Sequence, residues 1–445
     1  MFVAQRLAVL PQSPLAPAEG CYALRFTHWA YYLVGQPRQD LLAIVQIQQS
    51  SSGNPAVAIS IFPSSESRIH ELEALPSTPD ALAHYAHQQN LPWVHISSPL
   101  LLEPVTVPKP WGQEIWYTGI EARGQAAVIG QGGSLPLPWV MEFLREQLDL
   151  AELEQLILLK VLDPLPDEGY GDLYFELHER KQEVYVVTHV DKSAWPDGCG
   201  AIQLGFSPDA RKEYKTEVAL KAAYGAAVKR YETVRRAIDA LLDEKKQQQG
   251  MTLSQPVAAH QLKLWINELS QVAEYENLIE LEKEYKQAMN SFIALQPLAV
   301  GDVVTVPRLV PHALQHGVRV VEFQTPVYER KILSFGQKVL TQEHWDTVEA
   351  LTLVDMAADT LIKPESLLES AAVQVQRIVN FDEFEVCRIR LCGQHELKFD
   401  RYCLLMLLEG DASLTWMESS LELGAGEVVL VPAKPQASVH LKAAT

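Results

Sequence analysis

The sequence lacks the cysteine spacing that marks either a zinc ribbon or a disulfide framework. Its five cysteines are odd in number and scattered along the chain: Cys21, Cys199, Cys387, Cys392 and Cys403. It also lacks an apolar run long enough to cross a bilayer, and Arg6, Pro11 and Gln12 interrupt the N-terminal segment before a signal-like core can form. These absences predict a cytoplasmic protein with reduced thiols.

Basic residues are also scarce. The chain has 37 lysines and arginines against 56 aspartates and glutamates, which gives a net charge of −19. No stretch concentrates positive charge, so the sequence argues against nucleic acid and membrane surfaces as partners. A few lysines and arginines gathered at one site would still hold the phosphate of a small substrate. The Walker loop, the dinucleotide fingerprint and the G-x-S-x-G elbow are all missing.

The length of 445 residues suggests roughly two to four domains. Residues 1–95 combine short β-like runs with one helix-compatible stretch and contain no recognisable catalytic spacing. Residues 96–206 and 294–340 have strand texture, residues 207–293 have helical texture, and residues 341–445 show the strand–turn–strand rhythm of a small β-barrel. The predicted fold class is therefore mainly β with a helical insertion and an extra N-terminal α/β module.

The helical segment begins at Ser207-Pro208, where serine suits the N-cap and proline suits the first helical position. Apolar residues then recur at three- to four-residue or related spacings up to Leu242, which indicates an amphipathic helix. A second such pattern runs from about Pro256 to Phe292. We expect the two helices to form an antiparallel hairpin between strands of a β domain.

The stretch ELHERKQE, Glu176 to Glu183, is the most informative local pattern. Side chains two apart in a strand share a face, so Glu176 and His178 project together, as do Lys181 and Glu183. A distant histidine such as His312 would complete the three or four donors that a divalent ion needs. Mixed charges at alternate positions are more often found on a solvent-facing strand, and a lone histidine beside a proline is more often a turn or core residue than a ligand. Local spacing leaves these alternatives open.

Four phrases that stand in a particular order add a second line of argument. They are KPWGQE at 109–114, LILLKVLDP at 156–164, DLYFELHE with KQE at 172–183, and GDVVTVPRLVPHALQHGVRVVEFQTP at 301–326. Their order resembles that of the type I phosphomannose isomerases, which are metal-dependent members of the cupin superfamily. The helical insertion and the C-terminal phrase LEGDASLTWMESSLELGAGEVVLVPA also resemble the family's layout, so the resemblance covers roughly residues 105–445.

The resemblance implies two cupin-type β-barrels of the jelly-roll kind. Residues 96–206 and 294–340 would form a metal-binding cupin domain, interrupted by the helical insertion at 207–293. Residues 341–445 would form a C-terminal cupin-like β domain without a metal site. Residues 1–95 lie outside the resemblance, and their role is unknown.

Carried over residue by residue, the family's metal ligands fall on Glu176, His178, Glu183 and His312. This implies one divalent metal ion, with zinc as the expected ion. Glu176 departs from the family, which has a glutamine at that position. Two carboxylates around the ion would neutralise more of its charge and lower its Lewis acidity.

The resemblance also implies which residues meet the substrate, a small sugar phosphate. Lys181 and Arg330 are the expected catalytic residues, and Trp111 joins them in substrate binding. Lys331 is an alternative to Arg330 as the residue that corresponds to the family's arginine. Spacing alone would equally make Lys181 a solvated lysine, and a tryptophan in a strand is more often a packing residue.

The function implied is a metal-dependent aldose–ketose isomerase that converts mannose 6-phosphate to fructose 6-phosphate through an enediol. The alternative is a divergent non-enzymatic cupin that binds a sugar or metal, or acts as an interaction protein. Glu176 favours that alternative, as does Glu179, which stands where the family has proline. A metal-dependent oxygenase on the same barrel is a third class.

Overall fold

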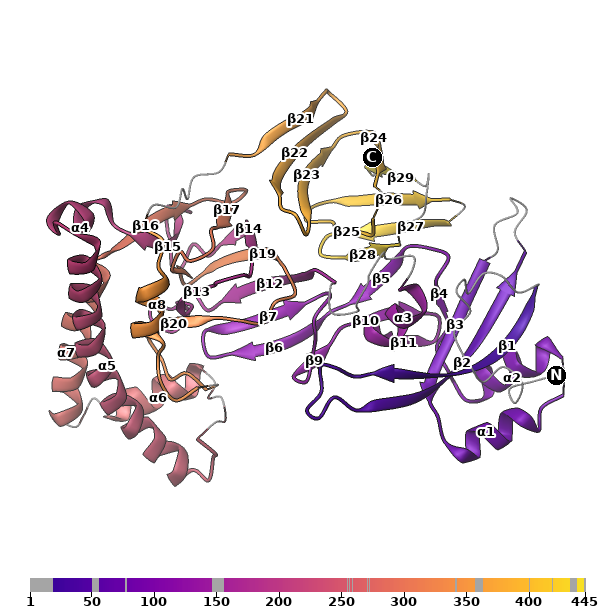
Figure 1. Cartoon of the computed structure of the whole chain (residues 1–445), viewed down its shortest axis with the longest axis horizontal. Helices are drawn as coiled ribbons and strands as arrows, with labels where there is room; N and C mark the ends of the chain where they lie inside the picture. Colours follow the sequence, from indigo (N-terminus) through magenta and orange to yellow (C-terminus); the bar gives the residue numbers. More distant parts are fainter. Residues whose placement is uncertain are drawn as a thin grey trace.

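The described part of the chain is mainly β, as the sequence predicts. The computed structural model describes residues 19–443 except 50–55, 77, 146–155, 254, 256, 258, 270, 272, 341, 357–362, 400, 418 and 433–437. Within these residues, 29 strands and eight helices form a molecule that is elongated in Figure 1. The N-terminal sheet and the helical segment lie at opposite ends of it.

Four antiparallel strands near the N-terminus form one sheet. Its order is β1 (Gly20–Trp29), β2 (Arg38–Gln48), β3 (Ala56–Pro63) and β4 (Val94–His95), and helices α1 (Glu66–Glu73) and α2 (Pro79–Gln88) pack against it. Alternate residues of β2 enter two different cores. Leu42 and Ile44 pack with the helices, whereas Leu41 and Ala43 pack with strands from later in the chain. Burial on both faces explains the continuous apolar run of this strand.

Two central sheets carry the residues that the sequence singled out. The six-stranded sheet has the order β17 (Val303–Val306), β14 (Glu183–Val190), β19 (Val318–Gln324), β12 (Leu158–Pro164), β7 (Gly112–Trp116) and β6 (Val105–Lys109). The five-stranded sheet has the order β16 (Ile293–Leu298), β15 (Gly200–Phe206), β18 (His312–Leu314), β13 (Phe175–Leu177) and β20 (Lys331–Ser334). Side chains from both sheets, including Tyr185 and Ile202, pack into one hydrophobic core.

The helical segment contains α4 (Pro208–Glu213), α5 (Glu217–Gln248), α6 (Ala259–Leu269) and α7 (Ala273–Asn290). Ser207 caps α4, because its hydroxyl accepts a hydrogen bond from the backbone N–H of Ala210 at 3.0 Å. The prediction of a single helix over 256–292 is wrong, since α6 and α7 are separate. A straight helix of that length would be about 55 Å long. The break lets Trp265 of α6 and Tyr275 of α7 share one core with Ile238 of α5.

The C-terminal block joins strands from distant parts of the chain. One sheet has the order β11 (Gly133–Pro136), β10 (Ala127–Gly130), β5 (Leu100–Glu103), β28 (Val428–Val431) and β25 (Cys403–Met406). Strands β24 (Gln394–Lys398), β29 (Ser438–Ala443), β26 (Asp411–Trp416) and β27 (Ser419–Gly424) form a second sheet. Residues near position 100 therefore share a sheet with residues near position 430.

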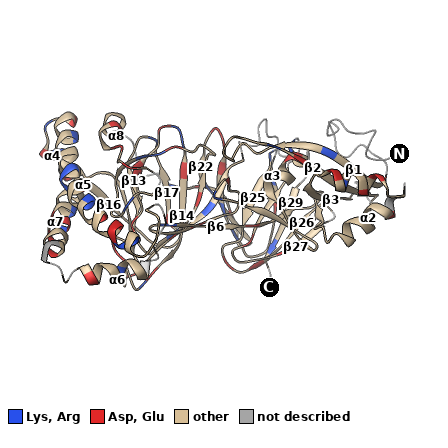
Figure 2. Cartoon of the chain, turned by 90° about the horizontal axis from the view of Figure 1, so that it is seen from below, with Lys and Arg blue, Asp and Glu red and all other residues tan. Residues whose placement is uncertain are grey.

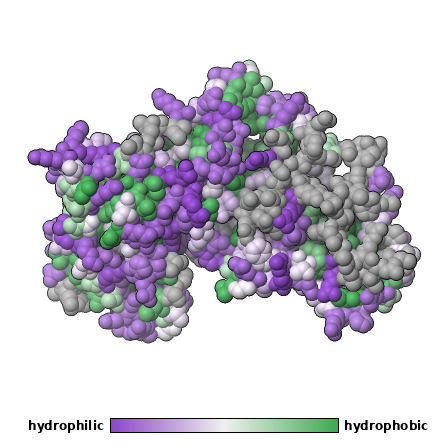
Figure 3. Space-filling view, viewed as in Figure 1, coloured by the Kyte–Doolittle hydropathy of each residue, from purple (hydrophilic) through white to green (hydrophobic). Residues whose placement is uncertain are grey.

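The remaining elements are short or lie at the edges. They are β8 (Ile120–Glu121), β9 (Gly124–Gln125), α3 (Leu137–Leu144), α8 (Thr347–Leu353) and the sheet of β21 (Glu365–Glu369), β22 (Val373–Asn380) and β23 (Glu385–Leu391). Acidic and basic side chains are interspersed over the chain in Figure 2, and the face in Figure 3 is largely hydrophilic. None of the described helices is long and apolar enough to span a membrane.

Candidate metal centre

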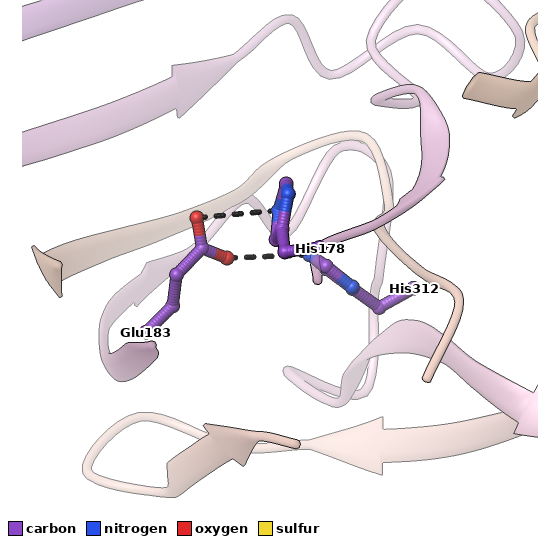
Figure 4. A group of neighbouring side chains, drawn as sticks. All are labelled: His178, Glu183 and His312. Carbon is purple, nitrogen blue, oxygen red and sulfur yellow. Dashed lines mark ion pairs between the residues drawn. The ribbon is translucent and has the colours of Figure 1, made fainter. Parts of the chain in front are cut away.

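Three side chains converge between the two central sheets: His178, Glu183 and His312 (Figure 4). Nε2 of His178 lies 3.4 Å from Oε1 of Glu183, and Nε2 of His312 lies 3.3 Å from Oε2 of the same carboxylate. All three side chains are at most 3% exposed. Within the described residues, this is a group of nitrogen and oxygen donors compact enough to hold a metal ion.

Sheet register explains the convergence. Glu176 of β13 lies opposite His312 of β18, and His178 follows directly after β13. Glu183 is the first residue of β14, on the other sheet. The turn between them is fixed by Glu329, whose carboxylate accepts hydrogen bonds from the backbone N–H groups of Arg180 and Lys181, the latter at 2.9 Å.

The second nitrogen of each histidine ring is held by backbone. Nδ1 of His178 lies 3.0 Å from the carbonyl oxygen of Glu329, and Nδ1 of His312 lies 3.1 Å from that of Val310. If each Nδ1–H donates to its carbonyl, both Nε2 atoms carry lone pairs toward the site, which is the tautomer that a metal ligand needs. Burial lowers the pKa of His178, against the opposing effect of Glu183, and so favours the neutral ring.

Unpaired polar atoms mark the same spot. Among the described residues, Nε2 of His178 and Oε2 of Glu176 are buried without a hydrogen-bond partner. Oε1 of Glu176 lies 3.8 Å from Nε2 of His178, so a further carboxylate borders the group of three without belonging to it. A divalent ion would give these atoms a partner. The residues present therefore fit the divalent metal ion that the family resemblance implies.

The two competing cations of the sequence analysis lie in different places. Arg330 lines the cavity at the metal centre, with its guanidinium 4.6 Å from the ring centre of Tyr174 and 3.8 Å from Oε2 of Glu176. Lys331 lies elsewhere, where its ammonium pairs with Glu179 at 3.3 Å and with Glu349 at 2.7 Å. The geometry therefore gives Arg330, and not Lys331, access to the site.

Lys181 and Trp111 also line this cavity. The ammonium of Lys181 forms an ion pair with Oε1 of Glu183. Lys181 lowers the pKa of Glu183, although burial alone would raise it. Trp111 is 1% exposed, and its indole Nε1 has no hydrogen-bond partner within the described part of the chain.

Four further charged residues lie beside the metal centre, and the sequence analysis missed them. Lys109 pairs with Glu114 at 3.0 Å, Lys160 lies 3.8 Å from the other oxygen of Glu114, and Lys160 pairs with Glu322 at 3.2 Å. Glu114, Lys160 and Glu322 line the cavity. The sequence pattern that could have pointed to Lys160 and Glu322 is a single charged residue within an otherwise apolar strand, as in LLKVL and VVEF.

Burial and ion pairing give the carboxyl groups of Glu114 and Glu322 very different pKa values. Burial would raise the pKa of Glu114, but Lys160 and Lys109 outweigh it and hold this pKa at about 2. Burial raises the pKa of Glu322 to about 8, and Lys160 only partly opposes this. Two carboxyl groups in one cavity with such different pKa values are a typical arrangement for proton transfer near neutral pH.

The cavity between these residues is small, at about 40 Å³. A water occupies about 10–15 Å³ of such space, so the cavity has room for an ion and a few waters. A larger cavity of about 430 Å³ lies among the helices, away from the metal centre.

Comparisons with known proteins show the fold. A scan against protein-family models finds no match, and no curated protein sequence matches the chain. Among solved structures, the fold is that of isomerases. One is mannose 6-phosphate isomerase from Bacillus subtilis, with 15% identity and a TM-score of 0.53 over 78% of this chain and 97% of that one. Another is a point mutant of phosphomannose isomerase from Salmonella typhimurium, with 16% identity and a TM-score of 0.50 over the same shares.

Proposed function

We propose that this protein is a metal-dependent aldose–ketose isomerase that acts on a sugar phosphate. The observation that carries the proposal is the convergence of His178, Glu183 and His312, beside a cavity that Glu183, His312 and Arg330 line. The shared fold with mannose 6-phosphate isomerases supports it, and mannose 6-phosphate and fructose 6-phosphate are the substrates we favour. We retain the cytoplasm as its location and the two central sheets as a cupin domain.

Glu176, His178, Glu183 and His312 would hold one divalent ion, for which zinc is our choice because two imidazoles and carboxylate oxygens suit it. When bound, such an ion polarises a carbonyl and its neighbouring hydroxyl. The second carboxylate, from Glu176, reduces that polarisation. Backbone carbonyls at Nδ1 of both histidines keep their rings in position.

Side chains of the protein would neutralise charge, transfer the proton and pack against the substrate. Arg330 would neutralise the phosphate or the charge that develops on the enediol oxygens, and Lys181 would share that role. Glu322 would move the proton between C1 and C2, since its raised pKa of about 8 lets it both take and return a proton near neutral pH. Trp111 would form an apolar wall.

A second candidate function is a non-enzymatic cupin that binds a metal or sugar. Two observations favour it. The cavity of about 40 Å³ suits an ion with waters better than a whole sugar phosphate. The ammonium of Lys181 already pairs with Glu183, and it would compete with an ion for that carboxylate.

A coupled assay separates the two candidates. Purified protein is stripped with a chelator, reloaded with zinc, manganese, cobalt or iron, and assayed for conversion of mannose 6-phosphate to fructose 6-phosphate. We expect metal-dependent turnover that is lost in His312→Ala and retained in His344→Ala, because His344 has an 80% exposed side chain. Tight metal binding without turnover under any ion would favour the non-enzymatic cupin.

A further inference from the structure

The larger cavity, of about 430 Å³, lies between the helical segment and the loops of the central sheets. Helices α5, α6 and α7 provide most of its wall, and the loops at 168–170 and 336–340 close the other side. No described residue lines both this cavity and the metal centre. Its volume falls in the range of about 300–1,000 Å³ that is usual for small-molecule sites.

Buried polar atoms without partners belong to residues of this wall. Within the described residues they are Oδ2 of Asp239, Oδ1 of Asp243, Nε1 of Trp265 and Oη of Tyr275. Asp239, Trp265 and Tyr275 are at most 5% exposed. Such atoms are uncommon because an unmade buried hydrogen bond is costly. The two carboxylate oxygens require donors, the indole requires an acceptor, and the phenol can take either.

Several charges of the wall are already paired. Arg235 donates to Asp239 at 3.1 Å and to Glu282 at 2.8 Å, and Lys338 pairs with Asp243 at 2.5 Å. Both signs are interspersed on these helices in Figure 2. A charged ligand would have to break one of these ion pairs to gain a partner there, which favours a neutral ligand at this part of the wall.

Aromatic rings complete the wall: Tyr170, Tyr231, Trp265 and Tyr275. Hydroxyl groups serve as donors and acceptors at once, and the C–H faces of a sugar ring pack on aromatic side chains. We infer that the cavity binds a neutral polyhydroxylated ligand of one or two sugar rings, at a site independent of the metal centre. This inference does not depend on the proposed isomerase activity.

Ligand-observed NMR titration of the full chain tests this site, with D-glucose and maltose as probes. Spermidine, inorganic phosphate and adenosine serve as cationic, anionic and nucleoside comparisons. Tyr275→Phe removes one unpaired polar atom and keeps the ring, whereas Trp265→Phe removes the indole nitrogen together with part of the ring. Leu262→Phe narrows the cavity without changing a polar group. His312→Ala is the control that reports any sugar bound at the metal centre.

We expect saturable binding of D-glucose or maltose, weakened about 5- to 10-fold by Trp265→Phe and by Tyr275→Phe, as for the loss of one hydrogen bond. Leu262→Phe should weaken it as well, and His312→Ala should leave it unchanged. Without ligand, Tyr275→Phe should melt no lower than the wild type, because the hydroxyl that it removes has no partner among the described residues. Trp265→Phe also removes buried apolar atoms, so its melting temperature should fall. Absence of sugar binding, binding indifferent to all three cavity variants, or binding of only spermidine, phosphate or adenosine would overturn the inference.

Discussion

Glu176 of β13 and His312 of β18 lie directly opposite each other on antiparallel strands. Side chains of such a pair project from the same face of a sheet, so a carboxylate and an imidazole enter one cavity from neighbouring strands. The family that the sequence resembles has a neutral amide where Glu176 stands, and this substitution adds a negative charge beside His178 and Glu183.

Replacement of Glu176 by glutamine should raise isomerase turnover while it weakens metal binding. The amide keeps an oxygen donor but removes a charge, which leaves the ion a stronger Lewis acid. We expect kcat to rise about threefold to tenfold. The measurements are kcat with saturating metal and the metal Kd by chelator competition. Glu179→Gln, next to the site but facing Lys331, should change neither. A fall in kcat at full metal occupancy would contradict this role for Glu176.

Arg330 and Lys331 form a matched pair for testing the anion site. Arg330→Met should raise KM for the sugar phosphate at least about tenfold, because a partly buried cation beside Glu176 is lost. Lys331→Met should leave KM within about twofold, since its partners Glu179 and Glu349 lie outside the cavity. Steady-state kinetics of both variants provides the comparison. Equal effects, or a larger effect for Lys331→Met, would reverse the assignment.

Glu322 should make stability depend on pH. Its folded pKa of about 8 lies above the ordinary value of 4.5, so the folded chain retains a proton that the unfolded chain releases. The free energy of unfolding should therefore fall as pH rises from about 4.5 to 8. Glu322→Gln should abolish this decrease in the free energy of unfolding, which we expect to be on the order of a few kcal/mol in the wild type.

Urea unfolding of metal-free protein at pH 5, 6.5 and 8 measures this difference. The gap between Glu322→Gln and the wild type should grow in favour of the variant as pH rises. Glu349→Gln is the control and should follow the wild type, because the side chain of Glu349 is 65% exposed. Parallel curves for Glu322→Gln and the wild type would show that Glu322 does not hold the proton.

Glu329 should act on metal binding through the turn that it fixes. Its carboxylate holds the backbone N–H groups of Arg180 and Lys181, and its carbonyl oxygen faces Nδ1 of His178. Glu329→Ala should weaken metal binding about 10-fold by loosening this turn. Glu329→Gln retains an acceptor oxygen and should recover most of the affinity, as zinc titration would show. If alanine and glutamine have the same effect, the turn does not depend on these hydrogen bonds.

Local patterns in the sequence predict the parts of the fold that depend on neighbouring residues. The start of the helical segment at Ser207 follows from its cap and from the proline that comes next. Apolar spacing predicts a helix through Leu242, and α5 contains the part from Glu217 onward. The end of α4 at Glu213 and the new cap at Thr216 were not predicted. The break between α6 and α7 escaped prediction, because it depends on how Trp265 packs against α5.

The sequence by itself determined which metal-binding side chains are available. The candidate ligands are residues of ELHERKQE and the distant His312, and they can be identified from the sequence because residue type and strand period are local properties. Only the tertiary structure decided which neighbouring cation enters the cavity, because adjacent residues such as Arg330 and Lys331 project in different directions. It also decided the pairing of Lys160 with Glu322, which are far apart in sequence and meet because β12 and β19 are neighbours in one sheet. The packing of whole sheets decides which distant strands become neighbours, and the local pattern of one strand does not specify its partner.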